Sequence, residues 1–416
     1  MTHPTHAGLP SHGIRRMTGR DPEEHHRVSS PLELFFDLTF AIAFGVAGNQ
    51  AAHLLGEGHV SGAVLGFGFA VFAIVWAWIN FTWFASAFDT DDWVFRVLTM
   101  VQMLGVLVLA VGLTPLFHSL DEGHSLANGT MIIGYIIMRV AMVAQWLRAA
   151  SQCEPALRRT CLTYAVGIAV TQAGWVVFYL LHAHGLSAVI GWLVMLGLEG
   201  AVPYAAERRA GAPTPWHPHH IAERYGLLAI IALGECLIGT IATLSAALEH
   251  GWTLDVALVG LAGTGLAFGL WWLYFLLPSG EALEADRDKG FRFGYLHIVV
   301  FGAIAAIGAG LHVAATVLSG ESHLSTLGAV LAVAVPVGVY TVSLAGLFQV
   351  LVGLNRSVVG TKTLEVAILV VAVVLASAGA SLPVCLLVVM AGPIAGVVTA
   401  ELGRDRMVRR ELAPSP

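Results

Sequence analysis

Charged residues are scarce in this chain. Asp, Glu, Lys and Arg make up 12% of its 416 residues, and hydrophobic residues make up 57%. Because a soluble domain carries about 25% charged residues, this composition excludes an ordinary soluble protein and predicts an integral membrane protein. The formal net charge of −6 gives no sign of a basic surface. We therefore expect the lipid bilayer, and no nucleic acid, as a partner.

Cysteine is also scarce, and known catalytic motifs are missing. The four cysteines, Cys153, Cys161, Cys236 and Cys385, show no paired spacing, so we predict no disulfide framework. There is no Walker loop, no Gly-x-Ser-x-Gly stretch and no dinucleotide-binding fingerprint. We therefore expect no enzyme and no bound cofactor or metal. The residues before Val28 are polar and rich in His and Arg, so we expect no cleavable signal peptide.

What the sequence does contain is a series of apolar runs separated by short polar connections. About twenty residues in a helix cross a hydrocarbon core of about 30 Å, so each run predicts a membrane-spanning helix. Pro336 lies inside the tenth run and predicts a kink. The twelve predicted spans are 31–55, 61–84, 93–115, 127–149, 160–181, 186–206, 222–248, 253–277, 291–318, 325–353, 360–381 and 383–401. The fold class is an all-α polytopic membrane protein.

Lys and Arg lie almost entirely before the first span, after the last span and at alternate connections between them. The intervening connections contain none: 56–60, 116–126, 182–185, 249–252 and 319–324. The positive-inside rule therefore predicts a multi-pass protein with both termini in the cytoplasm. Residues 1–30 and 402–416 are expected as cytoplasmic tails, the first of them disordered.

The order of features repeats with an offset of about 190 residues. Glu33 opens the first span and Glu223 opens the seventh. Aromatic runs end the second and eighth spans, and each is followed by an acidic loop and then by Phe-Arg, at Arg96 and Arg292. Six spans per half is an even number, so both halves enter from the same side. This pattern predicts two parallel six-helix repeats, 31–206 and 207–401, with the first and seventh spans near the pseudo-axis.

The most informative carboxylates lie on the first span. Glu33 and Asp37 are four residues apart, so they share a helix face. Asp37 has apolar neighbours and about twenty more apolar residues after it. A carboxylate at that depth in lipid is costly and usually faces a bundle interior or a wet cavity. Asp37 is therefore a candidate for a transport path or a proton relay.

Arg139, near the middle of the fourth span, is the most costly residue of all. It stays protonated and needs a carboxylate or carbonyl partner. Glu199 in the sixth span and Glu235 in the seventh lie at compatible depths. A structural ion pair and a substrate or gating site both fit this pattern.

Several further residues are candidates with simpler alternatives. Glu235 suits proton loading and release, and its alternative role is the partner of Arg139. His297 suits a relay with Asp37 or Glu235, although a histidine in a helix is more often structural. Polar residues such as Asn80 in the cytoplasmic halves of the spans suit a half-channel or single hydrogen bonds between helices.

The remaining candidates lie near the membrane interface and carry ordinary explanations there. Glu223 suits helix capping, and Arg224 suits a side chain that extends its charged end to water. Arg96 and Arg292 hold matching positions beside the two acidic loops, where interface anchoring explains both.

Two stretches resemble the signature motifs of the bacterial low-temperature-requirement A (LtrA) family. They are residues 31–42, Pro-Leu-Glu-Leu-Phe-Phe-Asp-Leu-Thr-Phe-Ala-Ile, and residues 223–235, Glu-Arg-Tyr-Gly-Leu-Leu-Ala-Ile-Ile-Ala-Leu-Gly-Glu. Residues 295–302 resemble a third motif. The resemblance runs from about Ser30 to the end and implies a multi-pass inner-membrane protein linked to low-temperature growth, without a settled biochemical activity.

A second resemblance concerns mechanism. Residues 36–43 are similar to the first helix of the endolysosomal potassium channel family, in which two six-helix repeats place that helix along the pore. Here Phe36 replaces the family's Ser, and the seventh span has no matching Asp. The implied alternative is a cation channel lined by the first span.

The load of ionisable groups in apolar helices favours a secondary transporter, with proton coupling as one form, for an unidentified small solute or ion. Asp37 and Glu235 would be its titrating groups. The alternatives are the cation channel and a non-transporting sensor or scaffold whose buried charges are structural. The sequence leaves open whether the protein forms a homo-oligomer.

Overall fold

The computed structural model describes residues 13–24, 27–122, 128–248 and 251–411, and these residues form helices and no strand. Twelve of the helices are long and apolar enough to span a membrane, which confirms the predicted number. They are α1 (Pro31–Gly56), α2 (Val60–Phe88), α3 (Trp93–Asp121), α4 (Gly129–Gln152), α5 (Pro155–Leu180), α6 (Gly185–Ala205), α7 (Pro218–Leu248), α8 (Leu254–Phe275), α10 (Gly290–Leu318), α11 (Thr326–Leu351), α12 (Arg356–Ser377) and α13 (Leu382–Glu411). Three short helices, η1 (Ala206–Ala210), α9 (Ser279–Ala285) and η2 (Arg287–Lys289), lie in the connections.

Local sequence signals fix where several helices begin. Ser30 caps α1, because its side chain accepts from the Glu33 amide while the Glu33 side chain accepts from the Ser30 amide, a capping box. Asp92 caps α3 in the same way through the Phe95 amide. Pro336 lies inside α11, and the helix continues on both sides of it. The four cysteines are free thiols.

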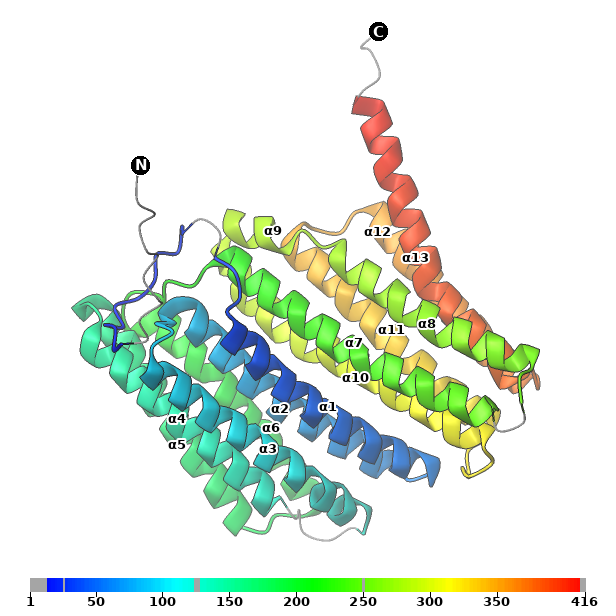
Figure 1. Ribbon diagram of the computed structural model, residues 1–416, viewed down its shortest axis with the longest axis horizontal. Coiled ribbons are helices and arrows are strands. Elements are labelled where there is room, and N and C mark those ends of the chain that lie inside the picture. The colour runs from blue at the N-terminus through cyan, green and yellow to red at the C-terminus, as the bar shows by residue number, and fades with distance from the viewer. Residues whose placement is uncertain (1–12, 25–26, 123–127, 249–250, 412–416) are drawn as a thin grey trace, which may run out of the picture.

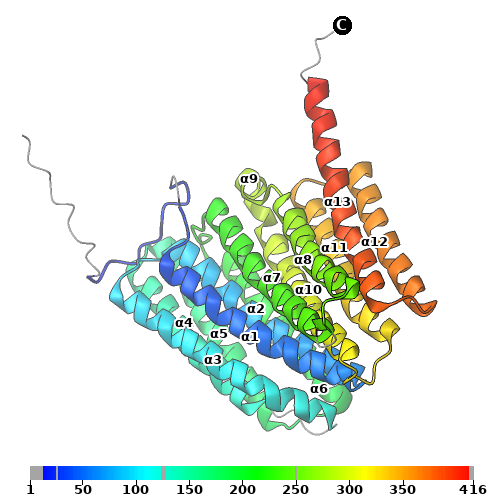
Figure 2. The ribbon, with the colours of Figure 1, turned by 45° about the vertical axis from the view of Figure 1, so that its right-hand side comes forward.

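The helices form two halves side by side (Figure 1). α1 to α6 make one half and α7 to α13 the other, and a turned view gives the same division (Figure 2). α1, α2, α7 and α10 meet at the boundary, where α10 packs on both α7 and α1. The start of α1 and the end of α13 lie at the same end of the bundle. We call this end the termini side and the opposite end the far side.

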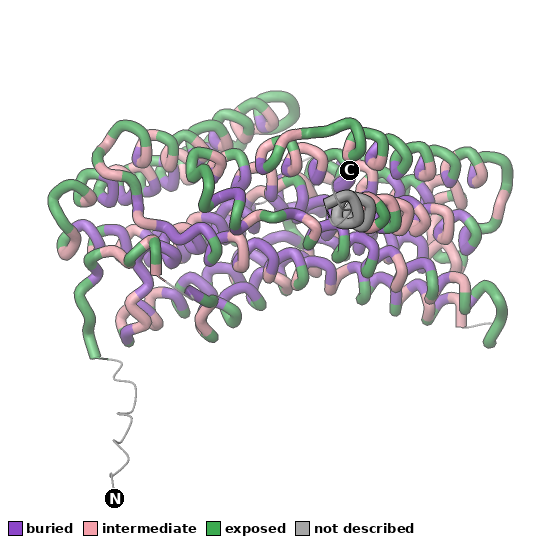
Figure 3. The backbone as a smooth tube through the Cα atoms, turned by 90° about the horizontal axis from the view of Figure 1, so that it is seen from above, coloured by how far each residue is buried: buried purple, intermediate pink, exposed green. Residues whose placement is uncertain are grey.

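The distribution of buried residues is consistent with this arrangement of the helices. Seen from above, buried backbone runs through the middle and exposed segments lie outside (Figure 3). α10 is the most buried spanning helix, and α6 and α12 are the least buried. In a bilayer these outer helices present apolar side chains to lipid, as expected of a polytopic protein.

The two halves join their helices in the same order. α1 packs on α2 and α3, α3 on α4 and α4 on α5; likewise α7 packs on α8 and α10, α10 on α11 and α11 on α12. The parallel repeat itself, with its boundaries at 31–206 and 207–401, stays a prediction.

One close pair of helices in the second half has no counterpart in the first half. α13 packs closely on α8, where a side chain added at Gly265 would meet Met390 and one added at Gly269 would meet Pro393. Small residues permit such close approach. At an offset of 194 residues, α2 carries Val71 and Val75 instead, and α6 is not among its close neighbours. This difference opens space between α2 and α6.

The described part of the N-terminal segment is ordered. The Arg20 amide donates to the carbonyl of Ala87 (2.8 Å), and the Met17 amide donates to the Gln152 side chain (2.7 Å). Met17 itself is buried. Residues 13–24 and 27–30 therefore pack on the termini side, in contrast to the disordered tail that the sequence predicted. The polar composition of this segment hid the contacts that its few apolar residues make.

Candidate functional site

The carboxylates of α1 meet an arginine and a histidine of α7. Glu33 and Asp37 lie four residues apart on one helix, and His220 and Arg224 lie four apart on the other, so each pair shares a face. Arg224 Nη1 is 3.1 Å from Glu33 Oε1, and its Nη2 is 2.5 Å from Asp37 Oδ1. His220 Nε2 is 3.2 Å from Glu33 Oε1. We call these four residues the motif cluster.

The motif cluster corrects the interface role predicted for Arg224. Its side chain, like those of Glu33 and Asp37, is fully buried. The Trp78 indole N–H donates to Asp37 Oδ1 (2.6 Å), and the Arg224 guanidinium lies 5.8 Å from the centre of the Trp78 ring. Two carboxylates on α1 compensate the buried guanidinium, which sequence position alone does not reveal. The cluster joins the two halves of the bundle.

A second layer of charge lies outside the motif cluster on the termini side. Arg27 Nη2 is 3.5 Å from Asp89 Oδ2 and 3.9 Å from Glu33 Oε1. Burial raises the pKa of Asp89 to about 6; the negative charge of Glu33 adds to this rise and Arg27 opposes it. Glu223 accepts from the Ser29 amide (3.2 Å). The start of α1 is thus held by charges from α7 and from the connection after α2.

Arg139 pairs with Glu199, one of its two predicted partners, and not with Glu235. The Arg139 Nη2 to Glu199 Oε2 distance is 3.1 Å, and Arg139 also donates to the Tyr135 hydroxyl. Glu199 further accepts from the indoles of Trp76 (2.8 Å) and Trp175 (3.1 Å). Both charged side chains are at most 3% exposed. Glu199 therefore has donors on both carboxylate oxygens in an aromatic surrounding, whereas Arg139 is bonded through Nη2 and its Nε has no hydrogen-bond partner among the described residues.

Glu235 lies apart from these pairs. It is half-buried on α7, 11 residues beyond Arg224, or about 16 Å along the helix axis. Its neighbours are glycines: a Cβ added at Gly45 of α1 would lie 3.2 Å from Glu235 Oε1, and one added at Gly308 would lie 2.8 Å from its Cβ. Among the described residues no side chain bonds its carboxylate.

His297 has both ring nitrogens occupied. Nδ1 lies 2.7 Å from the Phe293 carbonyl and Nε2 lies 2.9 Å from the Tyr274 hydroxyl. The ring therefore donates from Nδ1 and accepts at Nε2, as a neutral imidazole does. It contacts neither Asp37 nor Glu235 within the described contacts, so the predicted direct relay is absent there.

The other predicted residues occupy separate places. Arg96 forms a surface ion pair with Asp91 (2.9 Å). Arg292 is exposed. Of the polar residues expected in a half-channel, Asn80 lines a pocket on the termini side.

This pocket, which we call the aromatic pocket, has a volume of about 240 Å³. It lies in the space between α2 and α6 and is completed by α4, α5, α10 and the connections around η1 and η2. Six aromatic side chains form much of its wall: Trp83, Trp146, Tyr164, Trp216, Phe291 and Tyr295. Polar groups come from Asn80 and Glu207, and from Arg208, Arg287 and Asp288 at the exposed rim.

The aromatic pocket is closed toward the far side. One turn below Asn80, Trp76 packs edge-on against Tyr295, with ring centres 5.5 Å apart, and donates to Glu199. Trp76 is 1% exposed. Beyond the Arg139–Glu199 pair lies a small apolar hollow of about 20 Å³ with Trp175 and Trp192 in its wall. The ion pair therefore separates the two spaces.

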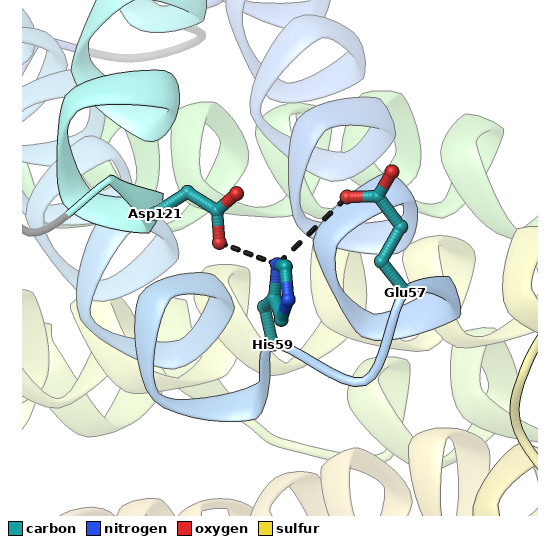
Figure 4. A group of neighbouring side chains, drawn as sticks. All are labelled: Glu57, His59 and Asp121. Carbon is teal, nitrogen blue, oxygen red and sulfur yellow. Dashed lines mark ion pairs between the residues drawn. The ribbon is translucent and has the colours of Figure 1, made fainter.

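A different group lies on the far side, where Glu57, His59 and Asp121 bring potential ligand atoms within 4.8 Å of one another (Figure 4). His59 Nδ1 is 2.5 Å from Asp121 Oδ1. His59 directly precedes α2 and Asp121 ends α3, and all three side chains reach solvent. An ion pair that joins the ends of two helices accounts for this proximity.

Two comparisons with known proteins place the chain. The family described as "Bacterial low temperature requirement A protein (LtrA)" matches residues 28–392. The chain belongs to the LtrA family. It is also 27% identical over 287 residues to "Uncharacterized protein RA0937" of Rhizobium meliloti (strain 1021), a match that covers 65% of this chain and 66% of that protein.

LtrA membership and the twelve apolar helices make the protein a multi-pass membrane protein. The two stretches that carry the resemblance to LtrA proteins are those that supply the motif cluster, with Glu33 and Asp37 from the first and Arg224 from the second. In this LtrA protein the motifs therefore bring the halves of the bundle together.

Sequence reasoning missed the aromatic pocket. Glu207 and Trp216 belong to a polar, Pro-rich connection after α6, and no periodicity predicts which of its residues turn inward. A buried pair, Lys362–Glu365 (2.7 Å) on α12, was also missed. The i,i+3 spacing of opposite charges at the start of an apolar run was the available signal for that pair.

Proposed function

We propose that this LtrA protein is a secondary transporter of a small solute, that the aromatic pocket is its binding site, and that the termini side faces the cytoplasm from the inner membrane. The observation that carries the proposal is the pocket itself, which is open on the termini side and closed beyond Trp76. A site open to one side at a time is what alternating access requires. The positive charges at the termini side support the orientation.

In this proposal one residue, Glu235, is the candidate group for proton coupling. Glu235 is a carboxylate within a span that has no bonded partner among the described residues. Such a group is costly in lipid when charged, which favours exchange of a proton over a fixed structural charge. Asp37, the other predicted titrating group, is bonded to Arg224 and Trp78, and we assign it to helix association.

Thiol labelling tests the proposal without knowledge of the solute. We would place Asn80→Cys in a Cys153→Ser background, since the other three cysteines are buried, and label it with a membrane-impermeant maleimide from either side of oriented vesicles. A transporter predicts labelling from the termini side and, more slowly, from the far side. Ser151→Cys and Ser187→Cys, exposed at the termini side and the far side respectively, are the controls for sidedness. Labelling of Asn80→Cys from the termini side alone, under every imposed proton gradient, would contradict the proposal.

The buried ion pairs between helices favour a second candidate, a non-transporting sensor or scaffold, in which Arg139–Glu199 and the motif cluster only hold helices together. It predicts one-sided labelling in the same experiment. A channel lined by α1 has less support, because Asp37, which such a pore would expose, has no exposed surface.

A further inference from the structure

Glu207 is a half-buried charge in the wall of the aromatic pocket. Its carboxylate accepts from the Tyr164 hydroxyl (2.8 Å), the Thr214 hydroxyl (2.8 Å) and the Thr214 amide (2.9 Å). Among the described residues no Lys, Arg or His nitrogen forms an ion pair with it, and the adjacent Arg208 is paired with Asp288 (2.9 Å). The pocket therefore holds a fixed acceptor group whose charge is in no ion pair within the described part of the chain.

The walls around Glu207 suit a cation with an apolar body. The negative faces of aromatic rings attract cations, and six aromatic side chains line the pocket. One cation already uses this wall at the rim, where the Arg287 guanidinium lies 5.4 Å from the centre of the Trp216 ring. A hard metal ion is a poor fit, since it requires about six oxygen ligands and, of the two carboxylates among the six rings of the pocket, Asp288 is paired with Arg208.

One further polar atom in the pocket has no partner among the described residues. Asn80 donates its amide to the Trp76 carbonyl (2.7 Å), so its side-chain oxygen is left as an acceptor. A ligand that satisfies this atom carries an N–H donor.

From this arrangement we infer that the aromatic pocket binds a small organic ammonium ion with an apolar or aromatic body, held by Glu207 and Asn80 at its cationic end. The inference names the substrate class of the proposed transporter and rests on that function only in calling the ligand a substrate. Binding itself needs no transport.

Equilibrium binding to the full-length protein in detergent tests the substrate class. The probe is tyramine, a phenol-bearing ammonium ion, and the matched probe is tyrosol, in which a hydroxyl replaces the ammonium group. Titration calorimetry should give a Kd for tyramine at least about tenfold lower than for tyrosol, because a charge-assisted contact with Glu207 is available to tyramine alone. No binding of tyramine, or equal binding of the two, would overturn the inference.

Substitutions then assign the contacts. Glu207→Gln should remove the preference for tyramine, whereas Glu281→Gln, an exposed carboxylate on the same side, should leave it unchanged. Trp146→Phe should weaken tyramine binding with the fold retained. A Glu207→Gln protein that still prefers tyramine would contradict the role of Glu207. If that variant fails to fold, the comparison of tyramine with tyrosol on the wild-type protein still tests the substrate class. Binding with this preference but without flux in vesicles would refute the transporter and leave the ligand class standing.

Discussion

Removing the charge of Glu199 should destabilise the fold more than removing that of Arg139. Glu199 accepts from Trp76 and Arg139 on Oε2 and from Trp175 and Tyr135 on Oε1. In Glu199→Gln, one of these two positions becomes an NH₂ group that faces two donors. The same change leaves the buried Arg139 guanidinium with the Tyr135 hydroxyl and no carboxylate.

The expected magnitudes follow from these contacts. Loss of one partner of a buried ion pair costs about 3–5 kcal/mol, and we expect Glu199→Gln to fall in this range. Arg139→Met leaves Glu199 with three of its four donors, so its cost should be nearer about 1–3 kcal/mol. The double variant should cost less than the sum of the single variants by about 1–3 kcal/mol, as for residues in direct contact.

The assay is reversible unfolding in mixed detergent micelles, with the free energy of unfolding measured for the wild type, both single variants and the double variant. Arg96→Met is the matched control, because it removes a surface ion pair with Asp91 and should cost less than about 1 kcal/mol. The reasoning fails if Glu199→Gln costs no more than Arg96→Met, or if Arg139→Met proves the more costly of the two buried changes.

Three further predictions use the same unfolding assay. Asp37→Asn takes one of two carboxylates from the buried Arg224 and should cost about 3 kcal/mol; a change below about 1 kcal/mol would mean that the motif cluster does not stabilise the fold. Glu235→Gln removes a carboxylate without a bonded partner and should be neutral within about 0.5 kcal/mol or stabilising, so a large loss would reveal a partner. Because the folded-state pKa of Asp89, about 6, lies above its unfolded value, the folded state binds the proton more tightly, and stability should rise by about 1 kcal/mol between pH 7 and pH 5. Asp89→Asn should flatten that rise, and an unchanged pH profile would exclude Asp89 as its source.

The sequence predicted the helices well because the hydrophobic requirement of a bilayer acts on every residue of a span. Each of the twelve spans corresponds to one helix, and α1 begins at the predicted Pro31. The partner of Arg139 was reduced to two glutamates by depth alone, because a buried guanidinium must meet a carboxylate. Choosing Glu199 over Glu235 required the rotation of α6 and α7 about their axes, which spacing does not determine.

The rest of the candidate site could not be predicted from the sequence, because it also depends on how the helices are rotated and packed. Arg224 was placed at the interface because it lies near the start of a span, yet the i,i+4 pairs of α1 and α7 face each other and bury it. Glu207 lies in a connection of high polarity, where inward and outward residues look alike. Its place in the pocket wall depends on the separation of α2 from α6, and that separation follows from which pairs of helices pack closely rather than from any single motif.

The most direct test of the account is uptake of radiolabelled tyramine into proteoliposomes, measured against protein-free liposomes and against liposomes that contain the Glu207→Gln variant. We predict uptake by the wild type well above both controls, with Glu235→Gln retaining tyramine binding but losing the dependence of uptake on an imposed proton gradient. Wild-type uptake no faster than in protein-free liposomes, from a protein shown to bind tyramine in detergent, would contradict the claim that this LtrA protein is a transporter.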